Sequence, residues 1–340
     1  MKANEDWIIP AKGEFRFEVS FSEKVILRLV AGQAEIYGAE LALGRDYELS
    51  GVKYAVFSYE GAQITLRGKC EVEYVSEEAP TMPIYLSAHF AIEGMRQQAF
   101  TQQDEPPRAL IVGSTRHTVA TILANYAVRS EKRPLLVDLD TNRGSLLFPG
   151  TLTAQQIDQV MSIEEARFQD AGICSYFYGH QLPSDNIKMY EKLMKRLSFA
   201  VNSRLAASSE ESTKSGAIII APADIGEHLG AIRENFNVNL IIVIGNERLH
   251  NTIVKNEPAC AVLKVPLSGG YVQLEPSYRR DLAQKQFKSY FYGPSHEFTP
   301  FSLVLPFENL QLRRLGEDAL APSSALPLGA TRKVSETRTS

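Results

Sequence analysis

The first part of the chain alternates apolar and polar residues as half-buried β-strands do. Phe15, Phe17 and Val19 fall on one face of such a strand, and polar residues lie between them. Glycines recur through residues 14–75 at the spacing of turns between short strands. This pattern predicts a small all-β domain over residues 1–80, folded as a sandwich or a barrel.

The middle of the chain has a different periodicity. Residues 81–107 predict a helix followed by a proline-containing linker, and apolar runs then alternate with helical stretches through residues 108–293. Such alternation predicts an α/β domain, in which helices flank a central parallel sheet of the P-loop type. Strands are predicted at 108–113, 134–140, 174–178, 216–221, 239–245 and 261–266, and helices at 118–129, 185–206, 226–236, 247–256 and 278–291.

The C-terminal part returns to a strand-like pattern interrupted by prolines. Residues 294–329 predict a partial C-terminal β domain. The last residues, 330–340, are polar and predict a disordered tail.

Composition and charge narrow the classes of function. The net charge of −4 argues against electrostatic attraction of nucleic acid by the protein as a whole, so RNA binding is expected to be weak or indirect. Three widely separated cysteines form no disulfide framework and no metal-binding pair, which favours a reducing intracellular compartment. No apolar run is long enough to cross a bilayer, so no membrane association is expected.

A strand ending in glycine and followed by a helix is the setting of a phosphate-binding loop. A loop of this type that starts at Gly113 requires glycine at position 118, lysine at 119 and serine or threonine at 120. The chain has Thr118, Val119 and Ala120 instead. The loop therefore lacks the residues that normally hold the nucleotide phosphates.

Two interpretations of the altered loop stay open. One is an unusual anion site at a helix N-terminus, to which Arg116 or His117 adds charge. The other is an ordinary turn between strand and helix, with Thr118 as the N-cap residue. The candidate nucleotide-binding residues of this segment are Gly113, Ser114, Thr115, Arg116, His117 and Thr118.

Ten short sequence strings occur in one order along nearly the whole chain. They are FRFEV (15–19), GQAEIYGAEL (32–41), VKYAVFSYEG (52–61), NYAVR (125–129), PLLVDLD (134–140), FPGTL (148–152), NERL (246–249), LSGGYV (267–272), SYFYG (289–293) and SALPLG (324–329). Together they resemble the eukaryotic polynucleotide 5′-hydroxyl kinases of the pre-mRNA cleavage and polyadenylation machinery. The resemblance implies three domains, with ATP and Mg²⁺ bound beside the loop and an RNA 5′-hydroxyl attacking the γ-phosphate.

The resemblance also assigns roles to individual residues. Glu14 and Lys53 match residues that contact the nucleotide, although a solvated surface pair is the alternative. Asp140 matches the acidic residue that serves magnesium and activates the hydroxyl. Asp138 and Asp140 are the candidate metal ligands, yet aspartate at a strand end is also common as a turn or cap residue.

Other positions depart from the pattern of the family or match it only in part. Arg279 and Arg280 match a lid over the nucleotide, with solvated helix charges as the alternative. Asn142 and Arg143 stand where the family has glycine and glutamine, and Leu274 stands where it has an arginine. These departures add to the altered loop and point away from efficient catalysis.

These observations favour an interaction protein: a pseudo-kinase that acts as a scaffold subunit in pre-mRNA 3′-end cleavage and polyadenylation. ATP and Mg²⁺ binding is then weak or lost. The expected partner is a cleavage-factor subunit with an RNA polymerase II tail-interacting domain, and the expected location is the nucleus. The alternative is a weakly active ATP-dependent polynucleotide 5′-hydroxyl kinase acting on RNA. An error in the gene model would also shorten the loop and the C-terminal region together.

Overall fold

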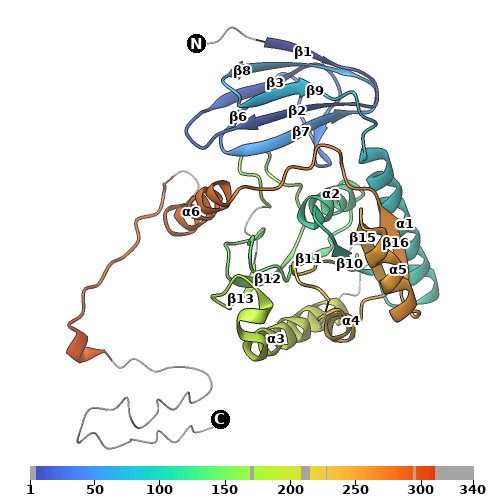
Figure 1. Ribbon diagram of the computed structural model, residues 1–340, viewed down its shortest axis with the longest axis vertical. Coiled ribbons are helices and arrows are strands. Elements are labelled where there is room, and N and C mark those ends of the chain that lie inside the picture. The colour runs from blue at the N-terminus through green and yellow to red at the C-terminus, as the bar shows by residue number, and fades with distance from the viewer. Residues whose placement is uncertain (1–4, 169–171, 208–214, 227, 294–295, 311–340) are drawn as a thin grey trace, which may run out of the picture. The chain divides into compact units, whose positions relative to one another are not determined.

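The computed structural model describes residues 5–168, 172–207, 215–226, 228–293 and 296–310. The chain separates into two units, residues 1–300 and residues 301–340. The first unit contains an all-β region and an α/β region (Figure 1). Among the described residues, no helix is both long and apolar enough to span a membrane.

The N-terminal region is a sandwich of two antiparallel sheets, so the predicted all-β domain is confirmed. One sheet has the order β1-β8-β3-β6 and the other β5-β4-β7-β2-β9. Phe15 and Phe17 pack between the sheets, as the alternation predicts. The strands are β1 (Glu5–Ile9), β2 (Gly13–Val19), β3 (Val25–Gly32), β4 (Glu35–Ile36), β5 (Ala39–Glu40), β6 (Asp46–Leu49), β7 (Val52–Ser58), β8 (Ala62–Gly68) and β9 (Val72–Val75).

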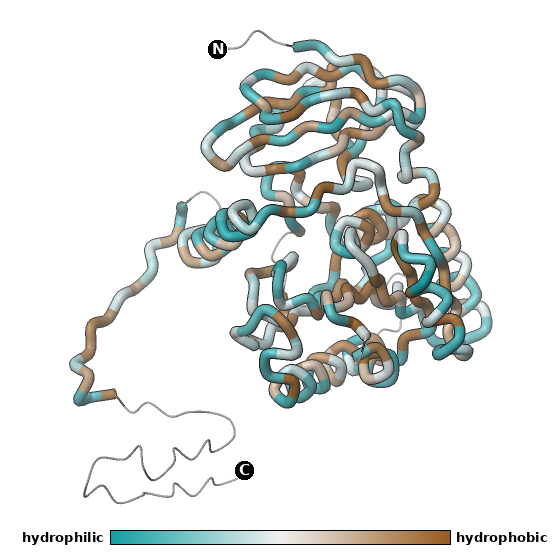
Figure 2. The backbone as a smooth tube through the Cα atoms, viewed as in Figure 1, coloured by the Kyte–Doolittle hydropathy of each residue, from teal (hydrophilic) through white to brown (hydrophobic). Residues whose placement is uncertain are grey.

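The central sheet has seven strands in the order β13-β12-β11-β14-β10-β15-β16. They are β10 (Arg108–Val112), β11 (Leu135–Asp138), β12 (Thr151–Gln156), β13 (Cys174–Phe177), β14 (Ala217–Ile220), β15 (Leu240–Ile244) and β16 (Ala261–Val265). The colouring of Figure 2 shows the middle strands as strongly hydrophobic, which fits a sheet buried on both faces.

The expectation of an all-parallel sheet needs a correction. Strands β11, β14, β10, β15 and β16 are parallel, but β12 is antiparallel to both β11 and β13. The chain reaches β12 from β11 without a crossover helix, and only an antiparallel pairing allows such a return. The α/β class itself is confirmed, as a mixed sheet flanked by helices.

Helices cover both faces of this sheet. α1 and α2 contribute to one apolar core, whereas α3, α4 and α5 contribute to the other. The helices are α1 (Met82–Gln102), α2 (Arg116–Arg129), α3 (Ile187–Ala206), α4 (Leu229–Phe236), α5 (Glu247–Asn256) and α6 (Pro276–Tyr292), with a short 3₁₀ helix η1 (Pro183–Asn186) before α3.

Helix α2 also joins the central domain to the sandwich. The Tyr126 hydroxyl donates a hydrogen bond to the buried carboxylate of Glu35, and Arg129 Nη1 lies 2.7 Å from the other oxygen of that carboxylate. Asn125 Nδ2 donates to the main-chain oxygen of Tyr37 at 2.9 Å. The position of α2 is therefore fixed by polar contacts as well as by its apolar face.

Helix α6 lies outside both cores and has no buried residue. Its side chains instead reach main-chain oxygens of two regions. Tyr278 Oη donates to Gly51 O at 3.0 Å, and Gln286 Nε2 donates to Gly144 O at 2.9 Å. The helix thus connects the sandwich with the segment that follows β11.

The partial C-terminal β domain is not seen in the described residues 296–310. They contain the 3₁₀ helix η2 (Phe307–Asn309) and no strand. Phe301 and Val304 are more than nine-tenths exposed, and these residues have no neighbouring strand with which to form a ladder. The rest of the predicted domain and the predicted tail lie outside the described residues.

Candidate functional site

The segment between β10 and α2 is short. Strand β10 ends at Val112 and α2 begins at Arg116, so only Gly113, Ser114 and Thr115 lie between them. Gly113 has φ +127°, and a Cβ there would lie 2.8 Å from the main-chain oxygen of Ile244. The glycine is therefore required by the close approach of β15.

The prediction of Thr118 as the N-cap residue is wrong. Thr115 is the N-cap residue, its side chain makes no capping hydrogen bond, and Thr118 lies in the first helical turn. The helix begins earlier than predicted because the side chains of Arg116 and His117 are both fixed by acceptors beside its first turn.

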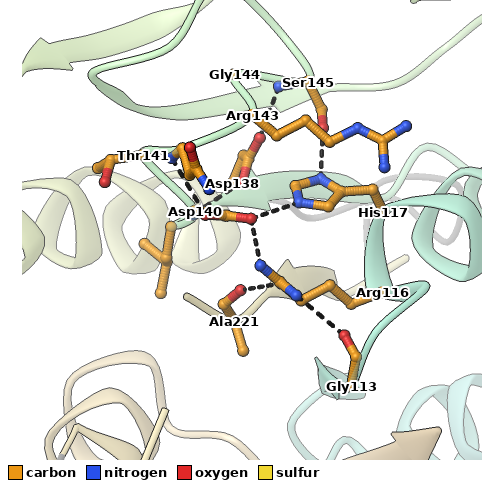
Figure 3. A network of polar contacts seen from close by, with 12 residues as sticks. Gly113, Arg116, His117, Asp138, Asp140, Thr141, Arg143, Gly144, Ser145 and Ala221 are labelled. Atoms are coloured by element: carbon orange, nitrogen blue, oxygen red, sulfur yellow. Dashed lines mark hydrogen bonds and ion pairs between the residues drawn. The ribbon is translucent and has the colours of Figure 1, made fainter. Parts of the chain in front are cut away.

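Arg116 points into the protein, and its side chain is 13% exposed. Its Nε donates to the main-chain oxygen of Ala221 at 2.7 Å, and Nη1 donates to that of Gly113 at 3.0 Å. Nη2 forms an ion pair with Asp140 Oδ2 (Figure 3). The guanidinium group thus bridges the ends of β10 and β14 and the segment after β11.

His117 binds the same carboxylate from the next position of the helix. Its Nε2 lies 2.7 Å from Asp140 Oδ2, and its Nδ1 contacts the Ser145 hydroxyl (Figure 3). Burial lowers the pKa of His117, so the ring is neutral near pH 7. The neutral ring then donates from Nε2 to Asp140 and accepts at Nδ1 from Ser145.

Asp140 is buried and remains ionised. Burial by itself raises the pKa of this carboxyl, but the hydrogen bond with His117 and the charge of Arg116 outweigh burial and lower it well below its usual range. The main-chain N–H of Asn142 adds a further hydrogen bond to Oδ1 at 3.2 Å. The negative charge is thus compensated inside the protein.

Asp138 organises the segment that follows β11. Its Oδ1 accepts from the main-chain N–H of Asp140 at 3.0 Å, and its Oδ2 accepts from that of Ser145 at 2.9 Å. Both oxygens therefore bind the backbone of the turn. Burial raises the pKa of this carboxyl.

These two aspartates do not fit Mg²⁺ in this arrangement. Magnesium requires free oxygen ligands in nearly octahedral geometry. Asp140 is bound by Arg116 and His117, and Asp138 is bound by two N–H groups. Among the residues that the structure describes, no group of three His, Cys, Asp or Glu side chains is placed to hold a metal ion.

The two candidate residues of the sandwich each have a partner within the sandwich. Glu14 is 4% exposed and accepts from Arg16 Nε at 2.7 Å. Lys53 forms an ion pair with Glu18, and its Nζ lies 5.3 Å from the centre of the Tyr278 ring. The alternative of a solvated Glu14–Lys53 surface pair is therefore wrong.

One cavity of about 1000 Å³ brings many of the candidate residues together. Its walls come from the sandwich, the loop before α2, the segment after β11, and α6. Candidate residues that line it are Glu14, Lys53, Ser114, Thr115, Arg116, His117, Thr118, Asp140 and Arg279. Gly113, Asp138 and Arg280 do not line the cavity.

The two lid candidates differ in position. Arg279 lines the cavity, and its Nε donates to the main-chain oxygen of Leu274 at 3.0 Å. Arg280 is exposed, and its Nε lies 3.8 Å from Asp281 Oδ1.

Two contacts of the loop were not predicted from the sequence, namely the Ser145 hydroxyl and the main-chain oxygen of Ala221. The signal for the first was a hydroxyl residue five positions after Asp140, in a turn set by Asp138.

Two family models match the chain. Residues 8–99 match the N-terminal beta-sandwich domain of polyadenylation factor, and residues 111–293 match the mRNA cleavage and polyadenylation factor CLP1 P-loop. The chain is 35% identical over 329 residues to the polyribonucleotide 5′-hydroxyl-kinase Clp1 of Homo sapiens and of Bos taurus, covering 94% of this chain and 76% of each relative. The chain belongs to the Clp1 family. The Clp1 homologue of Anopheles gambiae is 35% identical over 95% of this chain and 78% of its own length.

Solved structures show the same fold. A wild-type Clp1p–Pcf11p complex superposes with a TM-score of 0.78 at 22% identity, covering 86% of this chain and 74% of that chain. A second structure concerns the extended Pcf11p–Clp1p interface and ATP loss in a point mutant with arginine in place of glycine. It superposes with a TM-score of 0.76 at 23% identity, with the same coverage. At these identities the likeness supports the Clp1 fold alone.

Proposed function

We propose that this chain is a scaffold subunit of the pre-mRNA 3′-end cleavage and polyadenylation machinery and a pseudo-kinase. The observation that carries this proposal is the pairing of Asp140 with both Arg116 and His117. A carboxylate held in this way is part of the folded framework. It is not free to bind a metal ion or to accept a proton from an RNA hydroxyl.

The short loop supports the same conclusion. Phosphoryl transfer depends on positioning and on neutralising the charge of the phosphates. The loop has no lysine, and Val119 and Ala120 stand where a lysine and a hydroxyl would be. The donors of Arg116 point to Ala221 O, Gly113 O and Asp140, so this cation does not replace the lysine.

The partner is proposed from the family and from the intact central domain. Relatives carry the name of a polyribonucleotide 5′-hydroxyl-kinase, and the solved Clp1p structures contain Pcf11p. We infer that this chain binds, through its central domain, a cleavage-factor subunit that has an RNA polymerase II tail-interacting domain. The proposed location is the nucleus.

The catalytic part of the proposal is tested with radiolabelled ATP, Mg²⁺ and a 5′-hydroxyl RNA oligonucleotide. Loss of one electrostatic group typically costs about 10²–10³ in rate, and this site lacks two. We expect no detectable transfer, with the human relative assayed beside it as the positive control. Turnover that disappears in Asp140→Ala, while circular dichroism shows that this variant stays folded at the assay temperature, would establish the weak kinase instead.

The partner part is tested by affinity purification of the tagged chain from nuclear extract. We expect 3′-processing subunits to be recovered, and substitutions of Ser114 and Thr118, which leave the contacts of Arg116 and His117 with Asp140 in place, to leave that recovery unchanged. Recovery of ATP-metabolising enzymes alone, without 3′-processing subunits, would refute the scaffold role.

A further inference from the structure

We propose that the cavity beside the loop is a metal-independent binding site for the 5′-terminal phosphate of RNA, with Arg143 as its main cation. The inference deepens the proposed function, because it rests on the conclusion that Asp140 is already neutralised by the protein. It assigns to the cavity a ligand that needs neither a phosphate loop nor a metal ion.

Arg143 has a free guanidinium group at the cavity. Its side chain lines the cavity, and no ion pair or hydrogen bond engages it among the residues that the structure describes. Figure 3 shows the side chain extending past His117, away from the Asp138 and Asp140 carboxylates. An arginine with no carboxylate partner in a partly enclosed space favours an anionic ligand.

The backbone beneath Arg143 is held in place. Gln286 of α6 donates from Nε2 to the main-chain oxygens of Arg143 and Gly144, at 3.4 and 2.9 Å. The turn is also fixed from the other side by Asp138, which accepts from the N–H of Ser145. The guanidinium group therefore projects from a fixed base, which reduces the entropy lost when it binds a ligand.

The cations of the cavity fall into two groups. Arg16, Lys53, Arg116 and Arg167 are each paired with a carboxylate. Four others, Arg143, Arg279, Lys285 and Lys288, have no carboxylate within 4 Å among the described residues, and Arg279 Nε donates to the main-chain oxygen of Leu274. Lys285 Nζ donates only to the main-chain oxygen of Ser50, at 3.0 Å.

The group of unpaired cations suits a phosphate monoester. A terminal phosphate carries a charge of about −1.5 to −2 and three oxygens, and arginine binds such groups through paired N–H donors. A 5′-hydroxyl end offers no charge to these side chains. The cavity should therefore distinguish RNA with a 5′-phosphate from RNA without one.

Aromatic side chains give the cavity its preference for a nucleic acid. Tyr271 lines it and is 40% exposed, which leaves a face for a base to stack on. On the same helix as Lys285 and Lys288, the rings of Tyr290 and Phe291 are about half exposed and lie outside the cavity. Exposed rings of this kind are stacking surfaces for the bases that follow the 5′ end in a single strand, which a single nucleotide lacks.

The test measures fluorescence anisotropy of a short single-stranded RNA in EDTA, with either a 5′-phosphate or a 5′-hydroxyl. We expect about tenfold tighter binding of the phosphorylated RNA, from one charge-assisted contact. Arg143→Gln should abolish the difference, and Lys285→Gln should reduce it. The matched control is Arg196→Gln, an exposed cation of α3 outside the cavity, which should leave the difference unchanged. Melting curves of each variant check that it folds.

Equal binding of the two RNAs by the unmodified protein would overturn the inference. So would an equal loss of binding in Arg196→Gln, because the attraction would then be non-specific. Inorganic phosphate and a nucleoside 5′-monophosphate serve as competitors, and displacement at concentrations similar to those of the RNA would refute an RNA end as the ligand. No ATP is present, so failure here leaves the kinase and purification tests unaffected.

Discussion

Replacement of Asp140 by alanine should destabilise the central domain. The side chain is 3% exposed and contacts Arg116, His117 Nε2 and the N–H of Asn142. Its removal leaves the guanidinium of Arg116 without a counter-ion and the ring N–H of His117 without an acceptor. Because both groups stay buried, water can compensate only part of the loss.

The magnitude follows from these contacts. Removing one partner of a buried ion pair costs about 3–5 kcal/mol. Arg116 keeps its bonds to Ala221 O and Gly113 O, which lowers that figure, and the unpaired N–H of His117 adds about 1–3 kcal/mol. We expect a net loss of roughly 3–4 kcal/mol in the free energy of unfolding. For a domain of this size, that corresponds to a fall in Tm of roughly 6–16 °C.

The assay is thermal unfolding followed by circular dichroism at pH 7, with urea unfolding as a second measure. Asp158→Ala is the matched control, because Asp158 is exposed and its loss should change stability by less than about 0.5 kcal/mol. In a double-mutant cycle, Arg116→Met and Asp140→Ala should be non-additive, since they remove the same contact. An unchanged or raised Tm in Asp140→Ala would refute the reasoning. A carboxylate kept for catalysis commonly lowers the stability of the folded protein, so its removal leaves the Tm unchanged or raises it.

Three further outcomes are expected. Calorimetry should give an ATP affinity no better than about millimolar, about −4 kcal/mol; a micromolar constant that weakens in Lys53→Ala would contradict this. Glu35→Ala should cost about 2–3 kcal/mol of unfolding free energy, since it removes the carboxylate that accepts from the Tyr126 hydroxyl and one of the two carboxylate partners of Arg129, whereas exposed Glu60→Ala should cost little. Burial lowers the pKa of His89 to about 4, below its unfolded value, so the stability it contributes is complete above pH 6.5 and is lost as pH falls towards 4. Unfolding measured from pH 7 to 4 should depend less on pH in His89→Gln, and an unchanged dependence would show that other groups cause it.

Local patterns in the sequence predicted most elements of the central domain. Apolar runs located β10, β14 and β15, which are buried on both faces, within one or two residues. Strand β12 was missed because its sequence, TLTAQQ, is neither apolar nor regularly alternating. It is a strand because its two neighbours supply the hydrogen bonds, and a single sequence does not show that pairing.

The chemistry of the loop was predicted less completely than its position. The missing lysine and the short loop were visible in the sequence, and so was Asp140 at the end of a strand. The position of the Arg116 side chain was not visible, because two of its three acceptors lie 24 and 105 residues further along the chain. For Glu14 the sequence left a nucleotide contact and a solvated surface position open, and its pairing with Arg16, which allows it to be buried, was likewise not visible.

Arg116 and His117 both contact the carboxylate of Asp140, and this arrangement limits which substitutions the site can accept one at a time. Each of these three side chains is part of the environment in which the others are stable. Replacing Arg116 by a smaller residue would leave the buried carboxylate of Asp140 without its counter-ion. Replacing Asp140 would leave the guanidinium group of Arg116 without one. A loop that could hold the phosphates of a nucleotide would therefore require inserted residues and several coordinated substitutions, with less stable intermediates between them.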